Sequence, residues 1–321
     1  MVDNNPNVVN IVPVEQEPVK PMRASLYGSK DPLPEKFVEL IHKLEIEINM
    51  PIWMIIQNDD SEWGEISDKV YDAFHAVKAQ IEEKKPVGLL LHSPGGQAEE
   101  AYKIVRLFQR RTDKLTMIVP FYAKSAATLM AVGGNEILMG REAELGPLDV
   151  QIFNDEDNEY KSALNAVQAL ERLNAYALSA LDQFMLLLAA RTNKKVDALV
   201  ALASQYATSM VKPLMEKIDS VNLTEKSRAL KVAEDYAVRL MKEAGYSFAS
   251  AKRIASTLVE RYSTHGFVIG RSEALAFEDG LDYGLGLKIA ETKSSTEQIF
   301  DSLLPHLKEL TVIGNLEEIA A

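Results

Sequence analysis

The chain has 321 residues, of which 47% are hydrophobic and 26% charged, a composition ordinary for a soluble globular protein. Its net charge of −12 and isoelectric point of about 5.1 argue against nucleic acid or an anionic membrane as the main partner. There is no cysteine, which excludes disulfides, thiolate metal sites and a cysteine nucleophile.

The sequence predicts neither a membrane anchor nor a secretion signal. A transmembrane helix needs an apolar run of about 18 residues or more, and no such run is found. The nearest case, Ala175–Ala190, is interrupted by Ser179, Asp182 and Gln183, so we expect it to be a buried helix. The N-terminus lacks the basic start and apolar run of a signal peptide. We therefore expect a cytoplasmic protein.

Residues 1–34 form the first segment and hold six of the 13 prolines. Proline removes a backbone donor and fixes the backbone, so we expect an extended or disordered N-terminal arm. Within this arm, Val8–Val14 has the composition of a strand that adds to a sheet edge.

Residues 35–160 alternate between helical and strand patterns, and we expect them to form a catalytic core. Strands are expected at Met50–Gln57, Val87–Leu91, Leu115–Pro120 and Glu136–Met139, and helices from Glu35, at Ile66–Glu83 and at Ala98–Arg111. This alternation implies right-handed βαβ units and an α/β fold with a mainly parallel sheet. Such sheets bind ligands at the carboxyl ends of their strands.

The rest of the chain predicts a helical region over 161–262 and a closing segment over 263–321. Helices are expected at Ser162–Arg191, Lys194–Asp219, Thr224–Ala244, Phe248–Arg261, Ile269–Leu281 and Thr296–Leu310, with N-cap residues Asn222 and Thr224. The last of these helices is amphipathic, and we expect it to pack on a second subunit. No metal-ligand spacing or nucleotide-binding fingerprint occurs, so no cofactor is expected.

Two loops that follow strands carry the candidate chemistry. The first is the HSPGG sequence of residues 92–96, and the second is the YAKSAAT sequence of residues 122–128. Without side chains, Gly95 and Gly96 let backbone N–H groups approach a substrate and point at a developing oxyanion. An ordinary strand-to-helix turn is the structural alternative for this pair of glycines.

Ser125 follows a strand and precedes a helix of small residues, which exposes its hydroxyl at the sheet edge. The helix N-terminus stabilises negative charge there, and the N–H of Ala126 is a second oxyanion donor. A serine in this position also fits the role of a helix N-cap. The nearby glycine turn favours the nucleophile interpretation.

A serine hydroxyl needs a base to accept its proton, and the residues leave several candidates open. His265 is far along the chain, and His92 is expected to pack beside the sheet. Lys124 adjoins Ser125, but adjacent strand residues point to opposite faces. Lys161 is expected to start the long helix after a loop over Phe153–Tyr160, and desolvation under that loop would lower its pKa enough for a base. A solvated helix lysine is the structural alternative.

The LGPLD sequence of residues 145–149 forms a turn after the last core strand. Pro147 stiffens this turn, and a structural role is the simplest expectation for it. Asp149 is expected either to cap the turn or to orient the base.

The run HSPGGQAEEAYKIVRLF and the later run VPFYAKSAATLMAVGGNEILMGREAELGPLD together resemble the Clp/crotonase-fold serine peptidases. Within these they are most similar to the serine dehydrogenase proteinase family, which is related to signal peptide peptidase A and to stomatin-specific proteases. The similarity covers Glu35–Asp149 and resumes at Ser263–Leu281. It implies a Clp/crotonase-like fold, with a helical appendage outside it.

The resemblance also implies the site residues. Ser125 corresponds to the nucleophile, Gly96 and Ala126 to the oxyanion donors, and Lys161 to a lysine base. Clp proteases carry a histidine base about 25 residues after the serine, where this chain has Val150. A Clp-type triad is therefore not expected.

These observations predict a serine endopeptidase with polypeptide substrates, no nucleic-acid partner and a homo-oligomeric assembly. The expected catalytic pair is Ser125 and Lys161, supported by Gly95, Asp149 and His265. A catalytically inactive scaffold of the same fold is one alternative. A crotonase-like acyl-CoA enzyme is another, although no basic patch is predicted near the site.

Overall fold

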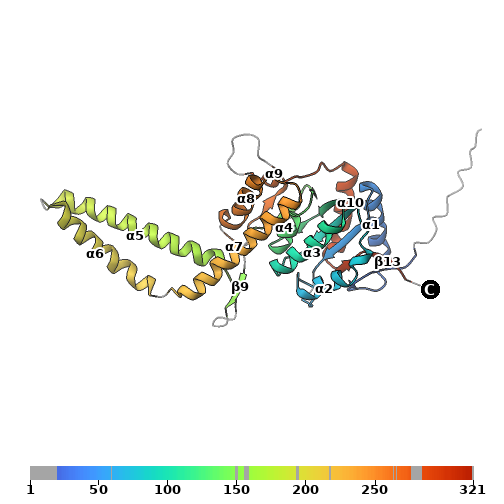
Figure 1. The fold of residues 1–321 in the computed structure, drawn as a ribbon, viewed down its shortest axis with the longest axis horizontal. Helices are drawn as coiled ribbons and strands as arrows, with labels where there is room; N and C mark the ends of the chain where they lie inside the picture. The colour runs from blue at the N-terminus through green and yellow to red at the C-terminus, as the bar shows by residue number, and fades with distance from the viewer. Residues whose placement is uncertain are drawn as a thin grey trace, which may run out of the picture.

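A six-stranded sheet forms the centre of the molecule (Figure 1). The structure, a computed structural model, describes residues 20–58, 60–148, 151–154, 159–192, 195–216, 218–262, 264, 266–275 and 284–319. Four parallel strands form the middle of the sheet: β3 (Ile52–Ile56), β4 (Pro86–His92), β5 (Lys114–Val119) and β7 (Glu136–Met139). Beside β3, β12 (Val312–Gly314) and then β2 (Tyr27–Gly28) complete the sheet in antiparallel pairing. The predicted α/β fold is confirmed.

Helices cover both faces of this sheet, as the continuous apolar strands require. Along β3, Ile52, Met54 and Ile56 face one core, and Trp53 and Ile55 face the other. The first core contains α1 (Glu35–Ile48) and α10 (Ser294–Leu307), and the second contains α2 (Asp68–Ala76), α3 (Ala98–Arg111), α4 (Ala126–Ala131), α7 (Ser220–Glu243) and α8 (Phe248–Ser256). The apolar face of α10 is thus used within the protomer, and its expected contact with a second subunit stays a prediction.

A smaller sheet lies at the carboxyl ends of the central strands. It consists of β6 (Tyr122–Ala123) parallel to β8 (Glu144–Leu145), with β11 (Ile269–Gly270) antiparallel to β8. A single bridge between Ser93 and Ala123 connects it to the end of β4. The two sheets thereby bring the HSPGG loop and the YAKSAAT loop together.

The described end of the N-terminal arm forms two short strands. Here β1 (Met22–Ala24) pairs with β13 (Leu316–Glu318), and β2 lies at the edge of the main sheet. The Val8–Val14 segment lies outside the described residues.

Several helix boundaries differ from the expectation. The helix expected over Ile66–Glu83 is limited to α2 and a short 3-10 turn, η1 (Lys78–Gln80), because the backbone of Ile66 bridges to Gly96 instead. Helix α7 starts earlier than expected. Its N-cap is Asp219, whose carboxylate accepts hydrogen bonds from the N–H groups of Val221 (2.9 Å) and Asn222 (3.3 Å). Neither Asn222 nor Thr224 is the cap.

The later elements follow the prediction in part. Helix α8 continues as a π-helical turn, η2 (Thr257–Arg261). The helix expected over Ile269–Leu281 is wrong at its start, because Ile269–Gly270 pair with β8 as strand β11, and α9 (Arg271–Leu275) follows. Between the core and the helical region, β9 (Gln151–Asn154) and β10 (Glu159–Ser162) form an antiparallel pair.

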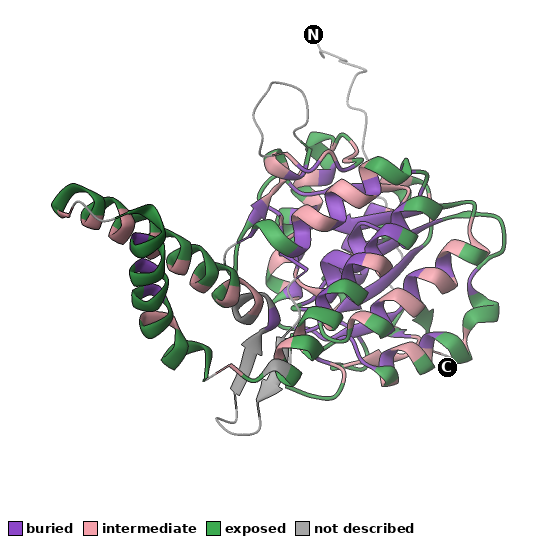
Figure 2. Ribbon diagram, turned by 60° about the vertical axis from the view of Figure 1, so that its left-hand side comes forward, coloured by how far each residue is buried: buried purple, intermediate pink, exposed green. Residues whose placement is uncertain are grey.

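Two long helices, α5 (Ala163–Arg191) and α6 (Val196–Met215), extend away from the core as a hairpin (Figure 1). Figure 2 shows that most of their residues are exposed. The expectation of a buried helix over Ala175–Ala190 is therefore wrong, because the core does not surround α5. By length and composition alone, Val167–Arg191 is the one helix in the described chain that would suffice to cross a bilayer, and none of its most apolar stretch is buried.

Candidate active site

The glycine turn after β4 is wedged between two backbone segments. Gly95 and Gly96 have φ angles of +116° and +138°, which side chains rarely permit. A Cβ atom on Gly95 would lie 2.8 Å from the carbonyl oxygen of Lys124 and 2.8 Å from the Cβ of Ser125. A Cβ on Gly96 would lie 2.3 Å from the carbonyl oxygen of Ile66. Only glycine fits either position, and Gly95 packs directly against Ser125.

Hydrogen bonds fix the direction of this turn. The N–H of Ile66 donates to the carbonyl oxygen of Gly95 (2.7 Å), and the N–H of Gln97 donates to the carbonyl oxygen of Ile66 (2.8 Å). The intervening N–H of Gly96 therefore points away from Ile66. In the described part of the chain it has no hydrogen-bond acceptor.

A buried polar network supports the turn from below. The Ser93 hydroxyl donates to Gln57 Oε1 (2.6 Å) and accepts the N–H of Gly95 (3.1 Å). The amide Nε2 of Gln57 donates to the carbonyl oxygen of Trp63 (2.7 Å). Both Gln57 and Ser93 are fully buried. Gln57 was not among the predicted site residues, although a glutamine at the end of an apolar strand was a usable signal.

Ser125 occupies a strained strand-to-helix turn. Its φ of 49° and ψ of −118° are unusual for a residue with a side chain, and such conformations cost about 1–3 kcal/mol. The residue is partly exposed, and its hydroxyl makes no capping hydrogen bond to α4. Ser125 therefore occupies the N-cap position of α4, but its hydroxyl does not cap the helix. A turn of this shape presents a serine hydroxyl at the top of a sheet.

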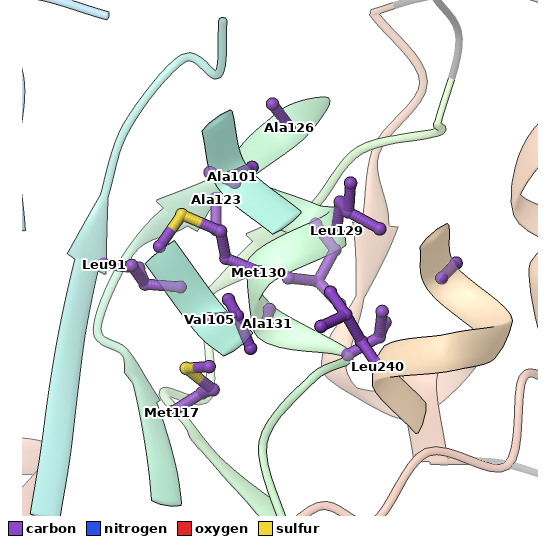
Figure 3. Packing of buried hydrophobic residues seen from close by; sticks show 14 of the residues in the cluster. Leu91, Ala101, Val105, Met117, Ala123, Ala126, Leu129, Met130, Ala131 and Leu240 are labelled. Carbon is purple, nitrogen blue, oxygen red and sulfur yellow. The ribbon is translucent and has the colours of Figure 1, made fainter. Parts of the chain in front are cut away.

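Helix α4 begins immediately after Ser125. The N–H of Ala127 donates to the carbonyl oxygen of Lys124 (2.8 Å), whereas the N–H of Ala126 has no acceptor among the described residues. The helix is fully buried. Figure 3 shows its small and apolar side chains packed among residues of β4, α3 and α7, including Leu91, Ala101, Val105 and Leu240. This packing holds the strained turn in place.

Thr128 ties three segments of the site together. Its hydroxyl donates to the carbonyl oxygen of Ala123 (2.7 Å) and accepts the N–H of Gly146 (3.0 Å). The LGP turn is thereby fixed beside Ser125, whose nitrogen would lie 3.4 Å from a Cβ on Gly146. Thr128, the only polar side chain in α4, was not among the predicted site residues.

Two of the candidate bases are engaged elsewhere. The Lys124 amine pairs with Glu144 (3.0 Å) and donates to the carbonyl oxygen of Leu145 (3.3 Å). His92 is fully buried, and its ring packs on Tyr122 at a centroid distance of 4.0 Å. Burial, with a smaller contribution from the charge of Lys308, lowers the His92 pKa from 6.5 to about 4. Neither side chain contacts the Ser125 hydroxyl among the described interactions.

The other predicted site residues are placed only in part. Lys161 lies in β10, where its backbone pairs with Ile152, two residues before α5 begins. Its side chain, together with Asp149 and His265, lies outside the described residues. Ser125, Gly95, Gly96 and Ala126 are therefore the residues that the structure brings together.

The described residues contain no cluster of His, Asp or Glu that would hold a metal ion. Among the described residues, the Ser125 hydroxyl has no hydrogen-bond partner, and the N–H groups of Gly96 and Ala126 have no acceptor. This combination serves nucleophilic attack on a carbonyl group.

Comparison with known proteins adds independent information. Two uncharacterised proteins of Methanocaldococcus jannaschii, MJ1495 and MJ0137, are each 31% identical to this chain, over 119 and 117 residues. These alignments cover 36% of this chain and 37% of each relative. The chain thus matches little more than a third of the length of these relatives.

Two solved structures of the 1510-N membrane-bound stomatin-specific protease, one in complex with a substrate peptide, are also similar. Their TM-score is 0.41 at 14% and 13% identity. The alignments cover 76% and 77% of this chain, and 81% and 78% of theirs.

The sequence profile of one protein family, described as ClpP-like SDH-type serine proteinases, matches residues 34–205. The match spans more than half of the chain and includes the glycine turn, Ser125 and β10. By this match, the chain belongs to the ClpP-like SDH-type serine proteinase family.

Proposed function

We propose that this protein is an endopeptidase that cleaves polypeptides through an acyl-enzyme on Ser125. The observation that carries the proposal is the position of the Ser125 hydroxyl. It stands on a strained turn without a capping partner and packs against the glycine turn. Within the described residues the N–H groups of Gly96 and Ala126 have no acceptor, and a Cβ on Gly95 would lie 3.1 Å from the Ala126 nitrogen, which supports an oxyanion hole at this turn.

The proposed reaction has two stages. The Ser125 oxygen bonds to the scissile carbonyl carbon while its proton passes to the base. The carbonyl oxygen becomes an oxyanion that accepts hydrogen bonds from Gly96 and Ala126. Collapse of this intermediate breaks the C–N bond, and the amine leaves with the proton from the base. Water then hydrolyses the ester by the same steps and regenerates the hydroxyl.

Lys161 is the proposed base. It lies within the family match and precedes α5, and the family resemblance of the sequence implies a lysine base at this residue. Ala163, two residues later, is fully buried in the core that contains Ala126 and Ala127. This burial supports a dry environment for the end of β10, which a neutral lysine requires. His265 is the alternative base.

A fluorophosphonate probe tests both roles because it reacts only with an activated serine. We compare the unaltered protein with Ser125→Ala and Lys161→Ala, and use Ser247→Ala as the control for an ordinary helix-cap serine. Labelling should be lost in Ser125→Ala and should fall by about a hundredfold or more in Lys161→Ala. Peptide hydrolysis should fall in parallel.

Each other result has a defined meaning. Labelling that persists in Ser125→Ala contradicts the nucleophile. Full-rate labelling in Lys161→Ala, with loss in His265→Ala, moves the base to His265. A complete absence of labelling and peptide turnover in the unaltered protein contradicts the enzyme and favours the scaffold.

A further inference from the structure

The α5–α6 hairpin carries more apolar surface than its two helices cover between them. Between the helices, α6 buries Leu199, Ala203 and Ala207. The rings of Phe184 and Tyr206 stack across the hairpin at a centroid distance of 4.3 Å. Many other apolar side chains on both helices remain in contact with solvent.

Four of these side chains define an apolar flank: Tyr176, Leu187, Leu202 and Tyr206. They are between 39% and 51% exposed. Tyr176 and Leu187 are three turns apart and share one face of α5, and Leu202 and Tyr206 are one turn apart on α6. Because Phe184 of α5 stacks on Tyr206 of α6, these two residues lie at the same height along the hairpin. Large exposed apolar patches of this kind mark interaction surfaces.

A lipid bilayer does not fit this hairpin as its covering. Helix α6 carries an exposed polar stripe opposite its buried residues, formed by Asp197, Ser204, Gln205, Thr208 and Lys212. Polar groups without partners are costly in hydrocarbon, so this stripe needs water. A partner that covers only the apolar flank leaves the polar stripe in solvent.

The charge of the hairpin favours a second copy of the same chain. Residues 173–211 contain two acidic and three basic residues, whereas the whole chain has a net charge of −12. Two copies of the acidic core repel each other, but two hairpins meet with almost no net charge. The hairpin is therefore a part of the surface on which copies approach each other at little electrostatic cost.

The size of the hairpin is sufficient for a stable contact. Its shorter helix has 20 residues, which corresponds to about 30 Å, and two packed helices are about 20 Å wide. Two hairpins face to face would cover about 1,200 Å² in total, the lower limit of stable protein interfaces.

We infer that the α5–α6 hairpin is an interface between copies of this chain, in which two hairpins pack by their apolar flanks into a four-helix bundle. The polar stripe of each α6 stays in water on the outside of the bundle. This inference does not depend on the proposed peptidase activity.

Sedimentation of the full chain tests the interface. We compare the unaltered protein with the flank variant Leu187→Glu/Leu202→Glu and with the control Ser204→Glu/Thr208→Glu, which adds the same charge to the polar stripe. The flank variant should self-associate about a hundredfold more weakly, because two buried leucines per copy are worth several kcal/mol. The control should keep the mass of the unaltered protein.

Cross-linking gives a second readout, which stays valid if the flank variant does not fold, because it uses different variants. The chain has no cysteine, so Leu187→Cys and Ser204→Cys are each the only thiol in their protein. A bismaleimide should link Leu187→Cys into dimers and leave Ser204→Cys monomeric.

Three results would overturn the inference. The first is an unaltered protein that sediments as a monomer, and the second is equal cross-linking of the two cysteine variants. The third is flotation of the protein with phosphatidylethanolamine–phosphatidylglycerol vesicles, accompanied by protection of the hairpin from protease. Fluorophosphonate labelling of the same samples reports separately on Ser125.

Discussion

The segment around Ser125 and the α5–α6 hairpin lie less than 40 residues apart in the chain, yet they are stabilised in different ways. Around Ser125, α4 is buried on every side and the glycine turn has no room for a single additional carbon. The hairpin is held by a few buried residues on α6 and exposes apolar side chains to solvent. Rigid packing holds strained backbone for chemistry, whereas loose packing leaves a surface for a partner.

The largest effect is expected from Gly95→Ala. The added methyl group would meet Lys124 and Ser125 at 2.8 Å, in a backbone conformation that alanine rarely adopts. We expect fluorophosphonate labelling of Ser125 to slow by about a hundredfold or more, as on loss of an oxyanion donor. Gly270→Ala is the control because nothing lies within 4 Å of a Cβ there. An unchanged rate in Gly95→Ala would show that the turn does not position the site.

A pair of leucine truncations compares the two regions directly. Leu129 on α4 is fully buried, whereas Leu186 on α5 is 71% exposed. Leu129→Ala should lower the free energy of unfolding by about 2–5 kcal/mol, and Leu186→Ala should change it by less than about 0.5 kcal/mol. Urea denaturation measures both. Equal losses would contradict the contrast between the two regions.

His92 links the rigid region to pH. Its pKa is lowered to about 4 in the folded protein, whereas an unfolded histidine titrates near 6.5. Above pH 6.5, His92 is neutral in both the folded and the unfolded protein. As the pH falls from 6.5 toward 4, only the unfolded chain binds a proton at this histidine, so the free energy of unfolding declines by up to about 3 kcal/mol.

The variant His92→Leu should therefore lose this part of the pH dependence between 6.5 and 4, measured by denaturation at several pH values. His75→Leu, at an exposed histidine of α2, is the control and should follow the unaltered protein. If His92→Leu keeps the full dependence, His92 is not its source.

Gln57→Ala probes the network below the glycine turn. It removes the acceptor of the Ser93 hydroxyl and the donor to Trp63, both in a buried place. A buried group that loses its partner costs about 1–3 kcal/mol, which thermal unfolding should detect. Gln205→Ala on the polar stripe should leave the midpoint unchanged. If Gln57→Ala leaves the midpoint of thermal unfolding unchanged, the hydrogen bonds of Gln57 do not stabilise the glycine turn.

The smallest effect is expected from Lys124→Met. Its ion pair with Glu144 is partly exposed, so the variant should lose no more than about 1 kcal/mol of stability. Labelling of Ser125 should stay within a few-fold of the original rate because the amine is engaged away from the hydroxyl. If labelling disappears, Lys124 is the base and the role of Lys161 fails.

Most elements of the core were predictable from the apolar pattern. Helix α3 has the predicted bounds, and the four parallel strands coincide with the short apolar runs of the sequence. The glycine turn and Ser125 stood out because each directly follows a buried strand. Gln57 and Thr128 were missed because a single polar residue in an apolar run has many explanations until its partners are known.

The hairpin illustrates the opposite failure. The composition of Ala175–Ala190 predicts an element that avoids water, and burial in the chain's own core was the simplest expectation. The sequence does not show that the core is already covered by α3, α4, α7 and α8. Which helices cover a sheet face depends on how all the helices pack together in space.

The sequence alone determined the order of the elements, the two strand-end loops and the family, because these depend on local periodicity and on short motifs. Only the tertiary structure decided that Ser125 adopts a positive φ without a capping bond and that Gly95 packs against it. The exposure of the apolar side chains of the α5–α6 hairpin was likewise decided only by the tertiary structure. Contacts between residues far apart in the sequence decide both, and their energies depend on which surfaces meet in space.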